Sequence, residues 1–204
     1  MLGRLATRLL PVLLTLAACD GSTNNSDPAV VEHAFSVESI VAGNTDPANL
    51  SFMYLYDGVA YNRADAIANS SKVDFAYNYH GGGCSTCRFF ENATSMSTRT
   101  GYVSQFSTIT NSTILNVEQS DGITASDFDE IRSSSDIESL FTTNDLMLHT
   151  LADVTNRVTD VAVGKVFAFI DKAERKGFFL IGDYTANVPD GDKATLQLQV
   201  KIQP

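Results

Sequence analysis

One histidine and two cysteines form the closest group of reactive side chains in the sequence, within His80-Gly-Gly-Gly-Cys84-Ser-Thr-Cys87. Thiolate and imidazole ligands suit Zn or Cu, but this stretch offers no fourth ligand. A Cys-x-x-Cys pair can also exchange disulfides when it opens a helix at the end of a strand. Here three glycines precede the pair and no βαβ unit surrounds it, so the pattern favours a small structural disulfide between Cys84 and Cys87.

The N-terminal residues predict export and lipid attachment. Arg4 and Arg8 form a positive region before the apolar run at 9–16, and this run is followed by the small residues that a signal peptidase needs beside its cut. The cut falls before a cysteine, and Leu16-Ala17-Ala18-Cys19 resembles the bacterial lipobox, in which that cysteine receives a diacylglycerol. We therefore predict a lipoprotein signal peptide at 1–18 and lipidation at Cys19. The alternative is an ordinary cleaved signal in which Cys19 is incidental.

Lipidation predicts where the protein works. Two or three acyl chains anchor a protein stably, so we expect attachment to a bacterial membrane, with the outer membrane or cell surface favoured over the inner membrane. Export to an oxidising compartment also supports the disulfide between Cys84 and Cys87. The predicted sites are this disulfide and Cys19, with no catalytic residue, no cofactor and no metal. If a metal does bind, His80, Cys84 and Cys87 are the candidate ligands.

The chain is strongly acidic. It has 204 residues, with 14 Lys and Arg against 24 Asp and Glu. Arg4 and Arg8 leave with the signal peptide, so 12 basic and 24 acidic residues remain and the mature net charge is −12 with neutral His. This balance argues against a nucleic-acid partner, which needs a basic face, and against docking on anionic headgroups.

The remaining chain divides into a polar tether at 19–32 and a single folded domain at 33–204. Alternation of apolar and polar residues, or a short apolar run, predicts strands at 34–41, 50–56, 59–61, 73–79, 112–117, 162–170, 177–183 and 194–202. The turn dipeptide Asp57-Gly58 and the polar connection 171–176 predict hairpins. Within the fourth of these, Val73, Phe75 and Tyr77 share a face and Asp74 points the other way. In the last, the polar residues that point outward include Lys201.

Helical patterns lie between the strands. Arg63 to Ala68 forms one or two turns, and Thr124-Ala-Ser-Asp127 has the form of a capping box that opens a helix through Ile131. Further helices are expected at 135–141 and 145–157. Strands followed by helices and again by strands predict an α+β fold with a largely antiparallel sheet and a few short helices in the middle third. An all-β sandwich is the alternative.

Three segments resemble a broad set of poorly characterised lipoproteins from Bacteroidota-type bacteria. They are Leu55-Tyr-Asp-Gly-Val-Ala-Tyr61 with the range 68–77 after it, Ile123-Thr-Ala-Ser-Asp-Phe-Asp-Glu-Ile131, and Val163-Gly-Lys-Val-Phe-Ala-Phe169 with the range 176–181. In those lipoproteins a C-terminal pattern of glycine, strand, turn, glycine and strand follows a middle region rich in Ser and Asp. The resemblance implies no catalytic residues, and it does not include Cys84 and Cys87.

Five tyrosines could line a carbohydrate- or peptide-binding face or could fill the core of the sheet; they are Tyr54, Tyr56, Tyr61, Tyr77 and Tyr79. We expect a non-enzymatic binding or structural role in the cell envelope, with an unknown envelope protein, glycan or small molecule as partner. A membrane-tethered thiol–disulfide oxidoreductase that uses Cys84 and Cys87 is the alternative, and a metal-handling lipoprotein comes third.

Overall fold

The computed structural model of the chain describes residues 26–40, 51–79, 88–92, 105–110, 112–114, 122–144, 146, 157–158, 161–187 and 193–204. These residues form two antiparallel sheets and three short α-helices. The prediction of an α+β fold with largely antiparallel strands is therefore confirmed. Within the described ranges, the helices are all too short or too polar to cross a membrane.

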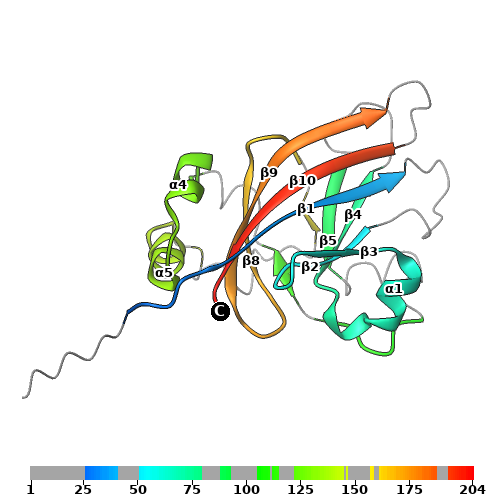
Figure 1. Cartoon of the computed structure of the whole chain (residues 1–204), viewed down its shortest axis with the longest axis horizontal. Helices are drawn as coiled ribbons and strands as arrows, with labels where there is room; N and C mark the ends of the chain where they lie inside the picture. The colour runs from blue at the N-terminus through cyan, green and yellow to red at the C-terminus, as the bar shows by residue number, and fades with distance from the viewer. Residues whose placement is uncertain are drawn as a thin grey trace, which may run out of the picture.

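The first sheet contains both ends of the folded chain. Its strand order is β1-β10-β9-β8-β6, and its strands span Val31–Ile40 (β1), Lys193–Ile202 (β10), Lys176–Asn187 (β9), Val166–Ile170 (β8) and Thr113–Ile114 (β6). In Figure 1, β1 and β10 run side by side along the molecule. The predicted polar connection at residues 171–176 joins β8 to β9 as a hairpin, and its last residue, Lys176, is the first residue of β9.

The second sheet contains the strands from the first half of the chain and one short later strand. Its order is β3-β2-β4-β5-β7, with strands Val59–Tyr61 (β3), Ser51–Tyr54 (β2), Phe75–Tyr79 (β4), Arg88–Asn92 (β5) and Arg157–Val158 (β7). The expected hairpin between β2 and β3 is present, with Gly58 at a φ of +63° in its turn.

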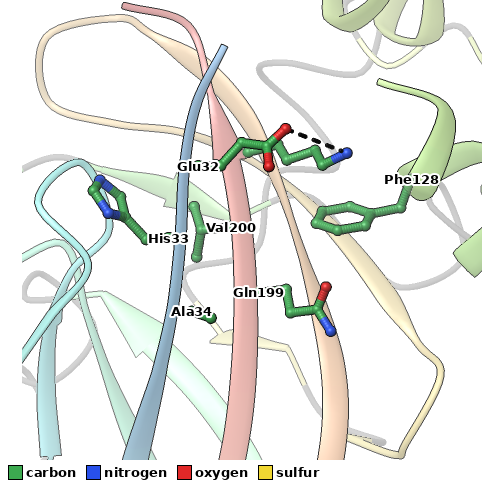
Figure 2. A pocket seen from close by; sticks show the side chains of 7 residues that line it. Glu32, His33, Ala34, Phe128, Gln199 and Val200 are labelled. Carbon is green, nitrogen blue, oxygen red and sulfur yellow. Dashed lines mark ion pairs between the residues drawn. The ribbon is translucent and has the colours of Figure 1, made fainter. Parts of the chain in front are cut away.

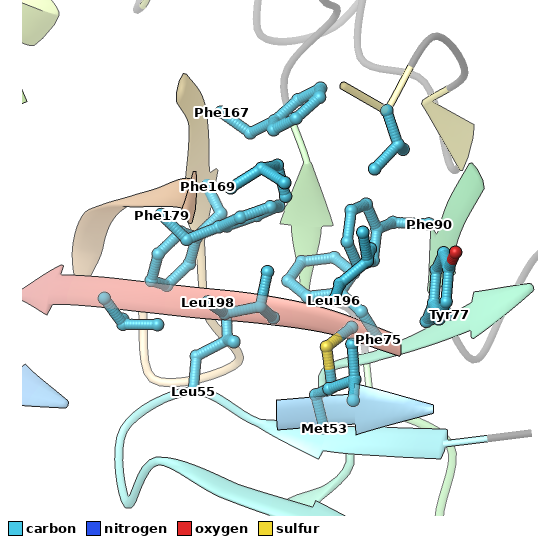
Figure 3. Packing of buried hydrophobic residues seen from close by; sticks show 14 of the residues in the cluster. Met53, Leu55, Phe75, Tyr77, Phe90, Phe167, Phe169, Phe179, Leu196 and Leu198 are labelled. Carbon is cyan, nitrogen blue, oxygen red and sulfur yellow. The ribbon is translucent and has the colours of Figure 1, made fainter. Parts of the chain in front are cut away.

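The two sheets pack face to face over an aromatic core (Figure 3). Phe90 of the second sheet lies 5.1 Å from Phe179 of the first, measured between ring centroids, and the rings meet edge to face. Phe167 stacks on the same Phe179 ring at 5.1 Å. Burial of such large side chains is a main source of stability in a sandwich. The space between the sheets is filled by side chains.

Short helices cover the outer faces of both sheets. Helices α4 (Ala125–Glu130) and α5 (Ser134–Thr143) pack Phe128, Ile137 and Phe141 against the first sheet. Helix α1 (Arg63–Ala68) and the 3-10 helix η2 (Ser70–Lys72) cover the second sheet, where Ala66 lies beside Phe52. The predicted capping box of α4 is present, because the Thr124 side chain accepts from the Asp127 N–H and the Asp127 side chain accepts from the Thr124 N–H.

Several strand and helix limits differ from the sequence prediction. β2 ends at Tyr54 and β8 begins at Val166, because turns occupy 55–58 and 162–165. Arg157 was expected at the end of a helix but pairs with Glu91 of β5. The rest of that expected helix lies outside the described residues, apart from Leu146.

Two polar residues expected on the outside are buried. Asp74 is fully buried because it precedes β4 and its carboxylate turns toward the segment before β6. Lys201 is 7% exposed because α4 covers its face of β10. Val73 was expected to share a face with Phe75. It lies instead in what we call the outer cluster, a group of buried residues on the outer face of the second sheet, because it precedes β4. The members of the outer cluster are Phe52, Ala66, Val73, Ala76 and Phe106.

The folded part starts earlier than residue 33. The Val30 N–H donates to the Arg132 carbonyl at 3.3 Å, and the Ser134 N–H donates to the Pro28 carbonyl at 2.9 Å. The Asp27 carboxylate accepts from the Ser135 N–H at 3.0 Å. Residues 27–30 therefore lie along the start of α5, and β1 begins at Val31.

Candidate functional site

Most of the side chains predicted to do chemistry lie outside the described residues. These are Cys19, His80, Cys84 and Cys87. Within the described ranges there is no group of three or more His, Cys, Asp or Glu side chains that could hold a metal. The lipidation and the disulfide remain predictions.

The tyrosines divide between the two roles left open by the sequence. Tyr77 is fully buried between the sheets, and Tyr61 packs partly buried in the outer cluster around Phe52. Tyr54 and Tyr56 lie at the end of β2 and in the turn after it, next to cationic side chains. The side chain of Tyr79 is outside the described residues.

A groove of about 280 Å³ lies on the outer face of the first sheet (Figure 2). Its floor consists of two cross-strand pairs, Glu32 with Lys201 and Ala34 with Gln199. Phe128 of α4 forms the wall. The sequence analysis did not predict this site, because the groove exists only where α4 packs beside β1 and β10. The alternating pattern of these two strands would be the same with or without a helix beside them.

Lys201 is held under the groove by the end of α4. Its ammonium donates to the Ile131 carbonyl at 2.9 Å, and lies 3.4 Å from the Asp129 carbonyl and 3.6 Å from the Glu32 carboxylate. The ammonium also lies 5.1 Å from the centroid of the Phe128 ring. A cation at a helix C-terminus satisfies carbonyls that have no partner in the helix. Lys201 is thus occupied in positioning α4.

The polar groups that remain open to a ligand are therefore a carboxylate and an amide, because Phe128 is only 1% exposed. Glu32 is 56% exposed as a side chain, and Gln199 is exposed on the adjacent strand. A second, smaller groove of about 210 Å³ on α4 and α5 is lined by Asp127, Glu130 and Asp136 among others. The second groove is therefore acidic, and it favours ligands with hydrogen-bond donors or cationic groups over anions.

His33 has a structural role at the edge of the groove. Its Nε2–H donates to the Tyr56 carbonyl at 2.7 Å, so the ring joins β1 to the turn between β2 and β3. Figure 2 shows the ring directed away from Phe128 and Glu32. The groove therefore contains no imidazole that faces a ligand.

Comparison of the chain with protein-family models, with curated proteins and with solved structures finds no match.

Proposed function

We propose that this chain is a lipid-anchored protein of the bacterial cell envelope that acts by binding or as a structural component. The observation that carries the proposal is Leu16-Ala17-Ala18-Cys19 after a basic and then apolar N-terminus. The outer membrane or cell surface is the proposed location, and the resemblance to Bacteroidota-type lipoproteins belongs to the same proposal.

The groove on β1 and β10 supports a binding role. It offers recognition groups on two paired strands, where backbone hydrogen bonding keeps Glu32, Ala34 and Gln199 in fixed positions. Rigid elements hold a binding site more precisely than loops do. The partner is proposed to be an envelope protein, a glycan or a small molecule, with donor or cationic groups toward Glu32.

Replacement of Cys19 by serine tests the proposal directly. We expect wild-type chain from cells grown with an alkyne fatty acid to carry the label, to fractionate with membranes and to begin at Cys19 by intact mass. Cys19→Ser should lose the label and leave the membrane fraction. The double variant Cys84→Ser/Cys87→Ser also removes thiols and should keep both properties. A soluble wild-type chain with an unmodified N-terminus at another residue would contradict the proposal.

A further inference from the structure

The start of β1 marks the end of the sandwich that lies nearest to Cys19 along the chain. Val31 pairs with Ile202, which pairs in turn with Gly177 of β9, while Lys176 pairs with Ile170 of β8. The turn at residues 171–175 is therefore at this same end. Figure 1 shows the C-terminus there as well.

The turn between β2 and β3 belongs to the same end. The hydrogen bond from His33 to the Tyr56 carbonyl joins it to the third residue of β1. The Arg175 guanidinium lies 3.3 Å from the centroid of the Tyr56 ring, which joins it to the turn between β8 and β9. Segments from three regions of the sequence thus meet beside the start of β1, just after the entering chain has passed the start of α5.

Five side chains cluster at this end and define what we call the basic tyrosine surface: Tyr54, Tyr56, Lys72, Lys172 and Arg175. Tyr54 is only 9% exposed, so its ring lies beneath the cations, and the accessible part consists of the cations and half-buried Tyr56. The ammonium groups of Lys172 and Lys72 lie 5.3 Å and 5.9 Å from the centroid of the Tyr54 ring. Both lysines are exposed, and neither forms an ion pair with a carboxylate in the part of the chain that the structure describes. Arg175 is already paired with Asp171 at 2.6 Å.

Carboxylates are interspersed with these cations. Asp57 and Glu174 are exposed in the same two turns, while Asp74 and Asp171 are buried beneath them. The surface therefore has mixed charge and is not polybasic. It suits a layer in which phosphates alternate with ammonium groups, as in zwitterionic headgroups. Tyr and Lys side chains also favour the membrane interface, because each combines an apolar body with a polar tip.

The connection to the lipid is short. Asp27 is eight positions along the chain from Cys19, with seven residues between them, and it accepts a hydrogen bond from Ser135 of the folded part. Fully extended, eight residues span roughly 28 Å. A domain of this size is about 40 Å across, so the end where the chain enters must stay closer to the anchored cysteine than one domain diameter.

From this arrangement we propose that the basic tyrosine surface contacts the headgroup phosphates of the membrane that holds the acylated Cys19. This inference depends on the proposed lipidation. The lysines supply the phosphate contacts, Asp57 and Glu174 face the headgroup ammonium groups, and the opposite end of the first sheet points away from the membrane. The overall negative charge of the chain opposes this contact only weakly, because salt screens exposed charges beyond about 10 Å and the surface itself, with Lys72 and Lys172 beside Asp57 and Glu174, is close to neutral.

The chain contains no Trp, so a single introduced Trp reports its own distance from lipid. Tyr56→Trp places the probe on the basic tyrosine surface. Tyr184→Trp is the matched control, since Tyr184 pairs with Leu196 near the other end of β9 and also packs partly buried against the inner core. Each full-length lipidated variant is reconstituted in phosphatidylethanolamine and phosphatidylcholine vesicles that contain brominated lipid, and fluorescence quenching is measured.

We expect strong quenching at position 56 and little at position 184. Adding Lys72→Gln and Lys172→Gln should remove most of the quenching at 56, whereas Lys165→Gln with Lys193→Gln, two lysines toward the other end of the first sheet, should not.

Equal quenching at 56 and 184, or no effect of the Lys72 and Lys172 changes, would overturn the proposal. So would loss of quenching at 56 when polygalacturonate is added at constant ionic strength, because the surface would then prefer a soluble polyanion. Failure of the wild-type chain to enter the vesicles would instead refute the lipidation.

Discussion

Asp74 is a fully buried carboxylate that joins the two sheets. It accepts from the Leu55 N–H at 3.0 Å and from the Ser112 hydroxyl at 2.6 Å. Leu55 follows β2 in the second sheet, and Ser112 immediately precedes β6 in the first. Burial raises the pKa of Asp74 to about 6, although both hydrogen bonds act in the opposite direction.

This carboxylate should make stability depend on pH. The folded pKa of about 6 lies above the ordinary value of 3.8, so the folded state binds a proton more tightly than the unfolded state between these values. The free energy of unfolding should therefore fall as pH rises from 4 toward 6, by at most about 3 kcal/mol, and level off above pH 7. Urea denaturation of wild type and Asp74→Asn from pH 4.5 to 7.5 checks this. The wild-type stability minus that of the variant should decrease over the range, and a constant difference would be inconsistent with a buried, titrating Asp74.

Among the elements, the tight turn between β2 and β3 depends on its close approach to β1. Gly58 has a φ of +63°, and a Cβ there would lie 2.5 Å from the Cβ and Cγ of His33. His33 cannot move aside easily, because its backbone pairs with Val200 in the sheet and its ring donates a hydrogen bond to the Tyr56 carbonyl. Gly164 has a similar φ of +82°, but a Cβ at that position would have open space for 4 Å around it.

These two glycines separate backbone strain from steric overlap. Gly164→Ala should cost about 1–2 kcal/mol of unfolding free energy, because only the left-handed backbone is unfavourable for alanine. Gly58→Ala should cost more, because it adds the overlap with His33. Chemical denaturation of the two variants under the same conditions gives the comparison. Equal losses would mean that the turn can move away from β1.

For the whole molecule, residues 27–32, which the sequence analysis assigned to the tether, are part of the folded structure. Asp27, Pro28 and Val30 form hydrogen bonds with the segment from Arg132 to Ser135. The hydroxyl of Ser133 and the hydrogen bonds from Ser135 lower the pKa of Asp27. The entering chain is thus attached to α5 before it pairs with β10.

Two truncations test this boundary. A chain that begins at Ser26 should unfold at the same urea concentration as one that begins at Asp20, since the polar sequence of residues 20–25 predicts a tether that buries little. A chain that begins at His33 should lose roughly 2–4 kcal/mol, because it lacks several hydrogen bonds worth about 1 kcal/mol each. Circular dichroism during urea titration measures both. If all three chains were equally stable, residues 26–32 would contribute nothing to stability and the predicted boundary at residue 33 would be correct.

Local patterns predicted the elements of this fold well wherever the controlling interaction lies within a few residues. The Thr124 capping box, the hairpin at Asp57-Gly58 and the inward residues of β10, such as Leu198 and Val200, are of this kind. Predictions were wrong where a distant segment covers the residue. Asp74 and Lys201 have ordinary polar positions in alternating strands, and no neighbour in sequence signals that Ser112 or α4 will bury them.

The sequence by itself determined two features. These are the predicted export and lipid attachment, through Cys19 and the residues before it, and the antiparallel character of the sheets. Both depend on contiguous residues, because a signal peptidase reads a linear motif and strand alternation has a period of two. Only the tertiary structure decided where functional surfaces lie. The groove beside Phe128 and the basic tyrosine surface each combine residues far apart in sequence, and such proximity arises from the packing of sheets and helices.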